Sequence, residues 1–164
     1  MKSELDQKIL ALLQENARIT DAELGDRLGI PAAQAAERIS ALEKNGTIRG
    51  YHAVVDNALL GDGAVRAIIE VEVQPERDGG FDRAARMISK FDEVLSVFLI
   101  SGRYDLRLEV SGKSLQEVAF FVASKLAPLK GVRSTATHFL LKKYKESGFV
   151  LDKDEEYERL KISP

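Results

Sequence analysis

Hydrophobic residues near the start of the chain repeat with a helical period and are interrupted by short turn signals. The first stripe predicts a helix from Leu5 to about Asn16; its members are Leu5, Ile9, Leu12 and Leu13. Thr20 and Glu23 then form a capping box, in which side chains satisfy free backbone N–H groups. The second helix that they open ends at Gly29, because glycine suits the left-handed position after a helix.

The segment after this glycine predicts a third helix followed by a β-hairpin. Pro31 is expected at the first helical position, where its missing N–H costs little, and Asn45-Gly46 ends the helix. Residues Thr47–Tyr51 are expected to form the hairpin. Two helices joined by a tight turn form the unit that places its second helix in a DNA major groove. The hairpin favours a winged helix-turn-helix over a plain three-helix bundle.

From Val65 onward the pattern changes to the alternation of half-buried strands. Strands are predicted at residues 65–73, 94–100, 104–110 and 132–144. Two helical stripes lie between them, and the second follows a Ser114/Glu117 capping box. The residues expected to point inward are Phe81, Ala84, Ala85, Ile88 and Phe91 in the first helix, and Leu115, Val118, Ala119, Val122 and Leu126 in the second.

This order of elements predicts an α+β protein: a winged helix-turn-helix followed by a ferredoxin-like βαββαβ domain, with both helices on one face of an antiparallel sheet. The uncovered face is expected to be apolar and to pack against another copy. We expect a DNA-binding domain at residues 1–50, a hinge at 51–64 and an effector-binding and oligomerisation domain at 65–145. Residues 146–164 are expected to form an acidic, solvated C-terminal segment.

Composition narrows the class of protein. Of the 164 residues, 45% are hydrophobic and 30% are charged, which is ordinary for a globular protein. There is no apolar run long enough to span a membrane and no signal peptide, so we expect a cytoplasmic protein without a membrane partner. The absence of cysteine excludes disulfides and thiolate chemistry.

Charge gives the chain no general attraction to DNA. The net charge is −2, and residues 1–50 contain seven basic and eight acidic side chains. Nonspecific DNA affinity comes largely from Lys and Arg releasing counterions. Any DNA affinity must therefore come from where the charges are placed and from several copies acting together.

Four motifs follow one another along the chain: LD-x-KIL-x-LLQ-x-N-x-R from Leu5 to Arg18, Leu42-Glu43-x-x-Gly46-x-Ile48 with Gly50-Tyr51, Ser101-Gly102-x-Tyr104-Asp105, and Gly131-Val132-x-Ser134-Thr135. Together they resemble the leucine-responsive regulatory protein/AsnC (feast/famine) family of transcription regulators. The resemblance implies homodimers that often assemble to octamers, and an amino-acid-like effector bound between subunits. It implies no catalytic residue and no cofactor. The Ala-rich run Ile30–Arg38 departs from the family pattern and offers few guanine-reading side chains.

Double-stranded DNA is the expected partner of the N-terminal domain. Gln34 and Arg38 lie one turn apart on the third helix and are candidates to reach base edges or phosphates. Two alternatives are open: Gln34 is a plain surface residue, and Arg38 instead pairs with Asp26 or Glu23.

Three further residues are candidate contacts to the DNA backbone. Arg49 lies in the expected wing, and Arg18 and Thr20 lie at the start of the second helix, where a helix N-terminus favours phosphate. The alternative for Arg49 is a plain surface position, and Thr20 is first of all a cap.

The candidate effector site is the turn between the strands predicted at 94–100 and 104–110, formed by Ser101, Gly102, Arg103, Tyr104 and Asp105. Glycine lets the chain turn sharply and exposes backbone N–H groups to a carboxylate. Asp105 is expected to accept from an ammonium group, and the ring of Tyr104 to wall the pocket. Thr135 and Thr137 share a face of the last strand and could line the same pocket, although threonine is common in strands. The alternative is a plain tight turn.

Enzyme and metal chemistry find little support in this sequence. His52 and His138 lie in different domains without cysteine or paired carboxylates at ligand spacing, so we expect no metal site. The two-domain plan also resembles haem-pathway decarboxylases, whose tetrapyrrole site two distant histidines would supply poorly. The other alternative is a nucleoid-type, DNA-organising protein that responds to no effector.

Overall fold

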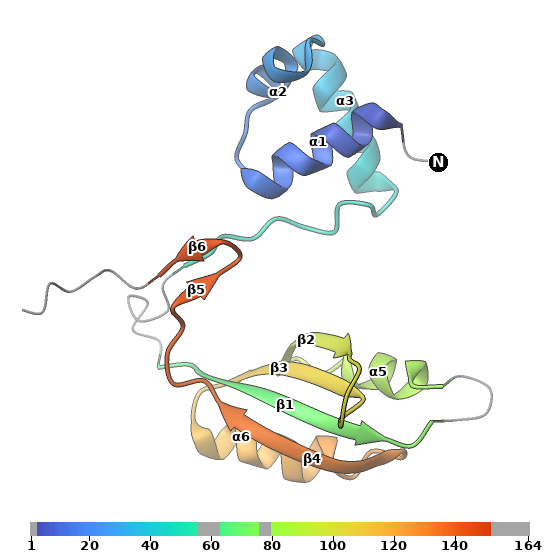
Figure 1. Cartoon of the computed structure of the whole chain (residues 1–164), viewed down its shortest axis with the longest axis vertical. Helices are drawn as coiled ribbons and strands as arrows, with labels where there is room; N and C mark the ends of the chain where they lie inside the picture. Colours follow the sequence, from blue (N-terminus) through green and yellow to red (C-terminus); the bar gives the residue numbers. More distant parts are fainter. Residues whose placement is uncertain (1–2, 56–62, 76–79, 152–164) are drawn as a thin grey trace, which may run out of the picture. The chain divides into compact units, whose positions relative to one another are not determined.

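The computed structural model describes residues 3–55, 63–75 and 80–151, and the chain divides into two compact units, Met1–Val54 and Val55–Pro164 (Figure 1). Much of the expected hinge, residues 56–62, lies outside the described residues, as does most of the acidic segment, residues 152–164. In the ranges described, no helix is long and apolar enough to cross a membrane.

The N-terminal unit is built from three helices: α1 (Glu4–Glu15), α2 (Asp21–Leu28) and α3 (Ala32–Lys44). The predicted Thr20/Glu23 capping box and the left-handed Gly29, with φ of 67°, are both confirmed. A second capping box, Ser3 with Asp6, opens α1. The helices enclose a core formed by Ile9, Leu13, Ile19, Leu24, Ala35 and Leu42.

Two local predictions in this unit are wrong. Pro31 is the N-cap residue and precedes the first residue of α3. The hairpin expected at Thr47–Tyr51 is not formed: the chain contains no strand between α3 and residue 55. The backbone after α3 bonds to the end of that helix instead: the Ile48 N–H donates to the Leu42 carbonyl at 3.0 Å. The Tyr51 hydroxyl also donates to Glu43, at 3.0 Å.

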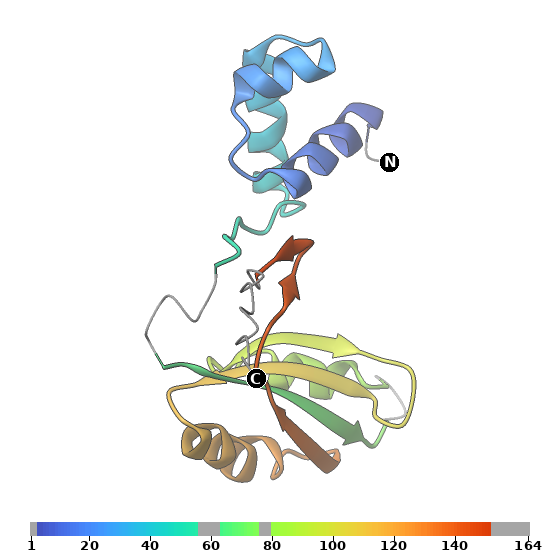
Figure 2. The ribbon, with the colours of Figure 1, turned by 60° about the vertical axis from the view of Figure 1, so that its left-hand side comes forward.

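The C-terminal unit has the predicted ferredoxin-like arrangement (Figures 1 and 2). Its strands are β1 (Val65–Val73), β2 (Val94–Leu99), β3 (Leu106–Gly112) and β4 (Val132–Phe139). They lie in the order β2-β3-β1-β4, and every neighbouring pair is antiparallel. The helices are α5 (Asp82–Ile88) and α6 (Leu115–Phe121), and a π-helical turn, η1 (Val122–Leu126), continues α6.

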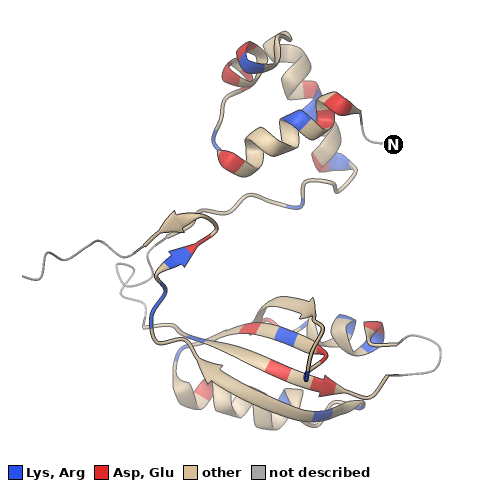
Figure 3. Ribbon diagram, in the orientation of Figure 1, with Lys and Arg blue, Asp and Glu red and all other residues tan. Residues whose placement is uncertain are grey.

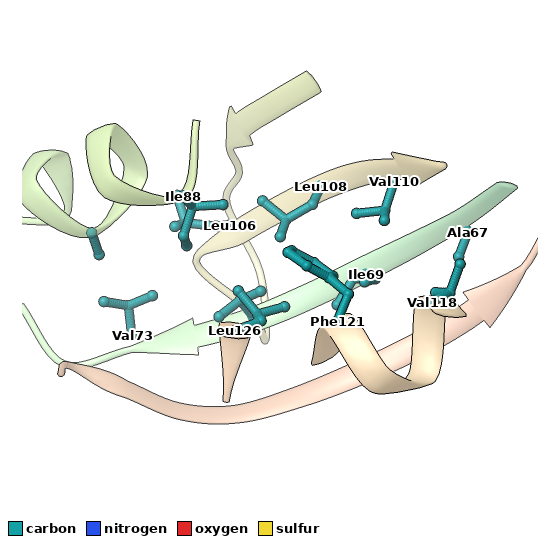
Figure 4. Close-up of a cluster of buried hydrophobic side chains, with 12 residues drawn as sticks. Ala67, Ile69, Val73, Ile88, Leu106, Leu108, Val110, Val118, Phe121 and Leu126 are labelled. Atoms are coloured by element: carbon teal, nitrogen blue, oxygen red, sulfur yellow. The ribbon is translucent and has the colours of Figure 1, made fainter. Parts of the chain in front are cut away.

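One face of the sheet packs against both helices (Figure 4). Ile69, Val71 and Val73 of β1 are buried there, as their alternation predicts. The ring of Phe121 lies edge-on to that of Phe91, with centroids 5.6 Å apart. The helices contribute Ala84, Ile88, Val118, Phe121 and Leu126 to this core.

The predicted inward face of α6 is partly wrong. Val118 and Leu126 are buried, but Leu115 is 50% exposed and Ala119 is exposed as well. Phe121, which the periodicity did not select, is buried instead. The physical reason is that the inward stripe of the regular helix runs through Val118 and Phe121 and leaves Leu115 and Ala119 outside it. The π turn then brings Leu126, five positions after Phe121, back to the sheet.

The uncovered face of the sheet is mainly polar, which corrects the expectation of an apolar face. Glu70 lies 3.3 Å from His138 of β4, and the Ser134 hydroxyl donates to Glu72 at 3.0 Å. On the neighbouring strand β3, on this same face, Arg107 pairs with Glu109 at 3.8 Å. The expectation failed because the apolar residues of β1 and β3 are used on the helix side.

The last strand ends earlier than predicted, at Phe139 instead of Tyr144. Leu141 is 97% exposed, so the residues after Phe139 do not continue a buried strand. A separate two-stranded hairpin follows, formed by β5 (Lys145–Glu146) and β6 (Phe149–Val150). Its turn contains Ser147 and Gly148, both with positive φ.

Candidate DNA-binding surface and effector loop

A close backbone contact at Gly25 holds the turn between α2 and α3. Gly25 is buried, and a Cβ atom added to it would lie 2.7 Å from the Ile30 carbonyl oxygen, closer than real Cβ contacts. The Ile30 N–H donates to the Gly25 carbonyl at 3.0 Å. Glycine is therefore required where α2 meets the start of α3. The position of this glycine inside a helical pattern is a sequence signal that could have indicated the close contact.

The outward face of α3 carries mainly small or uncharged side chains in its first half and charged ones in its second half. Ala35 and Leu42 are buried against the other helices, which leaves one side of α3 free. Gln34 is exposed there, so this predicted site residue can reach a groove. Glu37, one turn further on, is also exposed, although the sequence analysis did not select it. The exposed residues of α3 are Ala32, Ala33, Gln34, Glu37, Ala41, Glu43 and Lys44.

Arg38 is half-buried and pairs with α1. Its Nη1 lies 3.6 Å from Oδ1 of Asp6, an oxygen that is buried and accepts no hydrogen bond from the described residues. The alternative partners considered from sequence, Asp26 and Glu23, do not make this pair. The Arg38 side chain is still 44% exposed, so the guanidinium keeps access to solvent.

The other candidate DNA contacts are exposed but differ in how they are held. The Arg18 backbone N–H donates to Asn16, and its side chain is left on the surface. The Thr20 hydroxyl accepts from the Glu23 N–H at 3.2 Å and donates to the Glu23 carboxylate at 3.0 Å, so its capping role uses it fully. The guanidinium of Arg49 folds back over Gly46 at the end of α3.

Charges of both signs occur on all three helices, so no wide basic surface is formed there (Figure 3). The described residues also contain no group of three or more histidine, cysteine, aspartate or glutamate side chains that could hold a metal ion. DNA contact would therefore depend on a few placed residues.

The predicted effector turn is a loop between β2 and β3. The Ile100 N–H donates to the Asp105 carbonyl at 2.9 Å and closes the loop. Gly102 has a φ of 136°, a conformation that favours glycine. Ser101, Gly102 and Arg103 are exposed, whereas Tyr104 and Asp105 are half-buried. The Arg103 guanidinium lies 5.5 Å from the centre of the Tyr104 ring, within range of a cation–π contact.

Asp105 fastens this loop to the end of β1. Its carboxylate oxygen Oδ2 accepts from the Val73 N–H at 2.8 Å, and its own N–H donates to the Val71 carbonyl at 3.1 Å. The carboxylate therefore anchors the loop, a role that fits the alternative of a plain tight turn. Nothing in the sequence pointed to Val73 as its partner.

The structure brings Thr135 to the same end of the sheet, on the other side of β1. Thr135 lies opposite Val71, and Thr137 lies opposite Ile69, one pair further from the loop. Both threonines therefore share the helix-covered face with these two residues, and both are half-buried. The two threonines do share a face, as predicted.

Comparison with known proteins gives two family matches. Residues 66–150 match the Lrp/AsnC ligand binding domain, and residues 2–49 match a winged helix-turn-helix DNA-binding domain. The HTH-type transcriptional regulator YugG of Bacillus subtilis is 41% identical over 163 residues, which cover 99% of this chain and 98% of YugG.

Two further relatives extend these matches. The leucine-responsive regulatory protein of Haemophilus influenzae is 29% identical over 147 residues, covering 90% of this chain and 88% of that protein. The structure of a transcriptional regulator from Neisseria meningitidis, in complex with L-methionine, has 30% sequence identity and a TM-score of 0.65. The match covers 89% of this chain and 94% of that one.

Proposed function

Because this chain belongs to the Lrp/AsnC family of transcriptional regulators, we propose that its C-terminal domain binds an amino acid or a closely related small molecule, and that this binding changes how the N-terminal domains hold DNA. The chain is a DNA-binding regulator with a ligand-binding domain, and it is not an enzyme. The observation that carries the proposal is the match of residues 66–150, which include the effector loop Ser101–Asp105, to the Lrp/AsnC ligand binding domain.

The chemistry of this loop favours a ligand with both charges. The exposed backbone of Ser101–Arg103 and the Arg103 guanidinium offer donors to a carboxylate. Asp105 offers a negative charge to an ammonium group, and Tyr104 offers a flat apolar wall. Thr135 and Thr137 are proposed as neighbouring polar contacts. The complex of the Neisseria regulator with L-methionine supports an amino acid as the class of ligand.

DNA binding is proposed to use the outward side of α3. Gln34 would reach a base edge, and Arg38 would contact a phosphate beside its bond to Asp6. The backbone contacts proposed for the flanking segments are Arg18 and Arg49, and also Thr20 if its O–H exchanges the Glu23 carboxylate for a phosphate. Because the basic side chains of residues 1–50 are outnumbered by acidic ones, we propose that several copies bind together.

Assembly is proposed to begin with homodimers and to continue to octamers, with the effector held between subunits. Apolar side chains on the edge strand β2 support this: Leu95, Phe98 and Leu99 are 49%, 47% and 62% exposed. Exposed apolar residues that cluster normally mark an interface. A ligand between subunits would link effector affinity and DNA affinity reciprocally.

The decisive experiment is a thermal-shift screen of the full chain against the twenty amino acids, followed by calorimetric titration of the best hit. A ligand at 100 times its dissociation constant should stabilise the protein by about 2.7 kcal/mol. Adding that ligand should also change affinity for DNA in a binding assay. DNA binding without a shift by any amino acid would instead support an effector-independent, DNA-organising protein.

A further inference from the structure

The outward face of α3 carries one carboxylate that the fold does not use. Glu37 is exposed and, within the described residues, makes no hydrogen bond or ion pair. The other acid of α3, Glu43, accepts from the Tyr51 hydroxyl at 3.0 Å and is therefore occupied by the segment that follows the helix. Glu37 is thus available for an intermolecular contact.

The neighbours of Glu37 on the helix surface are all uncharged. Residues three and four positions away lie beside it, and these are Ala33, Gln34, Ser40 and Ala41. No cation at this spacing neutralises the carboxylate. Ala33 and Ala41 have small side chains on either side of Glu37, so another surface can approach this carboxylate closely.

A carboxylate at this place opposes general DNA affinity, because it faces a polyanion. It gains a favourable contact only where the major groove offers a hydrogen-bond donor without an adjacent acceptor. Cytosine offers its N4 amino group alone, whereas adenine places its N7 acceptor beside the N6 donor and guanine offers only acceptors. The net effect of such a residue is selectivity at the expense of affinity.

We propose that Glu37 is a specificity-determining residue that accepts a hydrogen bond from the N4 amino group of a cytosine, and so selects a C·G pair at one position of each half-site. This inference rests on the proposed binding of DNA through α3. Gln34, three residues earlier, lies about 4.5 Å back along the helix axis, comparable to the roughly 3.4 Å step between base pairs. The two side chains would then read adjacent positions.

The test is in vitro selection from a random pool of duplex DNA with the full chain. The variants are Glu37→Gln and Glu37→Ala, and the matched control is Glu15→Gln, which changes another exposed, unpaired glutamate at the end of α1. We expect wild type and the control to fix cytosine at one position. Glu37→Gln should replace it by adenine, which glutamine reads through N6 and N7. Glu37→Ala should lose about tenfold in discrimination there.

Two results would overturn the proposal while leaving the regulator's DNA binding intact. One is an unchanged selected sequence with a uniform gain in affinity for both Glu37 variants, which would mean that Glu37 only repels phosphate. The other is a wild-type protein that binds the pool without any preference at a cytosine. Failure of wild type to bind DNA at all would reject the proposed DNA contact through α3, and with it this inference. Circular dichroism of each variant confirms that it is folded.

Discussion

The carboxylate oxygen Oδ2 of Asp105 accepts a hydrogen bond of 2.8 Å from the backbone N–H of Val73. This bond joins the residue that precedes β3 to the last residue of β1, 32 positions earlier in the chain. The effector loop is therefore held at one end by a charged side chain, so its geometry and its chemistry depend on the same residue.

Two substitutions of Asp105 should separate anchoring from ligand binding. Asp105→Asn keeps an oxygen that can accept from Val73, so we expect near-normal stability but loss of effector affinity, because the charge that pairs with an ammonium group is gone. Asp105→Ala should also lose about 1–3 kcal/mol of stability, because it leaves the Val73 N–H without its partner. Chemical unfolding and calorimetric titration measure the two effects. Wild-type effector affinity in folded Asp105→Asn would show that the residue only anchors the turn.

Gly25→Ala should destabilise the N-terminal unit by about 1–3 kcal/mol, as overpacking does, since the added Cβ would press on the Ile30 carbonyl. DNA affinity should fall with it, because the start of α3 must move. Gly50→Ala is the matched control, since nothing lies within 4 Å of a Cβ placed there. Thermal unfolding and a DNA-binding assay give the comparison. Equal behaviour of the two variants would contradict the role given to Gly25.

Arg38→Ala should weaken DNA binding uniformly across sequences and lower the salt slope by about one per site. Stability should change by less than about 1 kcal/mol, because the partly exposed pair with Asp6 contributes little. Binding isotherms at several salt concentrations, with circular dichroism, test this. Arg38→Lys, which keeps the charge, is the control. Equal affinity of wild type and Arg38→Ala at low salt would reject the phosphate contact.

The free energy of unfolding of Glu93→Gln should fall less than that of wild type as the pH is lowered. The hydrogen bond from Lys125 holds the pKa of the Glu93 carboxyl below its usual value of 4.5. A pKa that is lower in the folded state gives stability that is complete above 4.5 and is lost as the pH falls through the folded value. The contribution should be at most about 1 kcal/mol, since the pair is partly exposed. Urea unfolding of both proteins at several pH values between 7 and 3 measures this. The free energies of unfolding of wild type and Glu93→Gln should converge as the pH falls; a constant difference between them would contradict the assignment.

Leu99→Lys should reduce the size of the assembly without unfolding the chain. Leu99 is 62% exposed on the edge strand β2, so its own unit loses little when it changes. Leu115→Lys, at an exposed apolar position on α6, is the control and should leave the assembly intact. Light scattering of the full chain measures the mass. An unchanged mass for Leu99→Lys would remove β2 from the proposed interface.

The sequence predicted best those features that depend on neighbouring residues. The capping box of Thr20 and Glu23 and the alternation along β1 need no knowledge of the rest of the fold, and both are confirmed. The hairpin at Thr47–Tyr51 was wrong because a strand needs a partner, and the available donor of Ile48 goes to α3 instead. Local propensity could not decide between these two uses.

The sites could be located only in part, because their key contacts join distant segments. Arg38 and Asp6 lie on different helices, α3 and α1. A single sequence does not show which acid an arginine meets across a core. It did identify the loop that contains Asp105, since glycine and the neighbouring polar residues mark a turn, but it could not supply the bond to Val73.

The π turn at the end of α6 sets the rotational phase of everything beyond it. Phe121 and Leu126 are both buried although they are five residues apart. In a regular α-helix that spacing would rotate the second side chain by about 140° away from the first. Deletion of a single residue within Val122–Lys125 would place Leu126 four positions after Phe121, a spacing that keeps both side chains on one face of an ordinary α-helix. This short segment should therefore tolerate the loss of one residue, which replaces the π turn by ordinary winding, better than the addition of one, which would turn Leu126 away from the core.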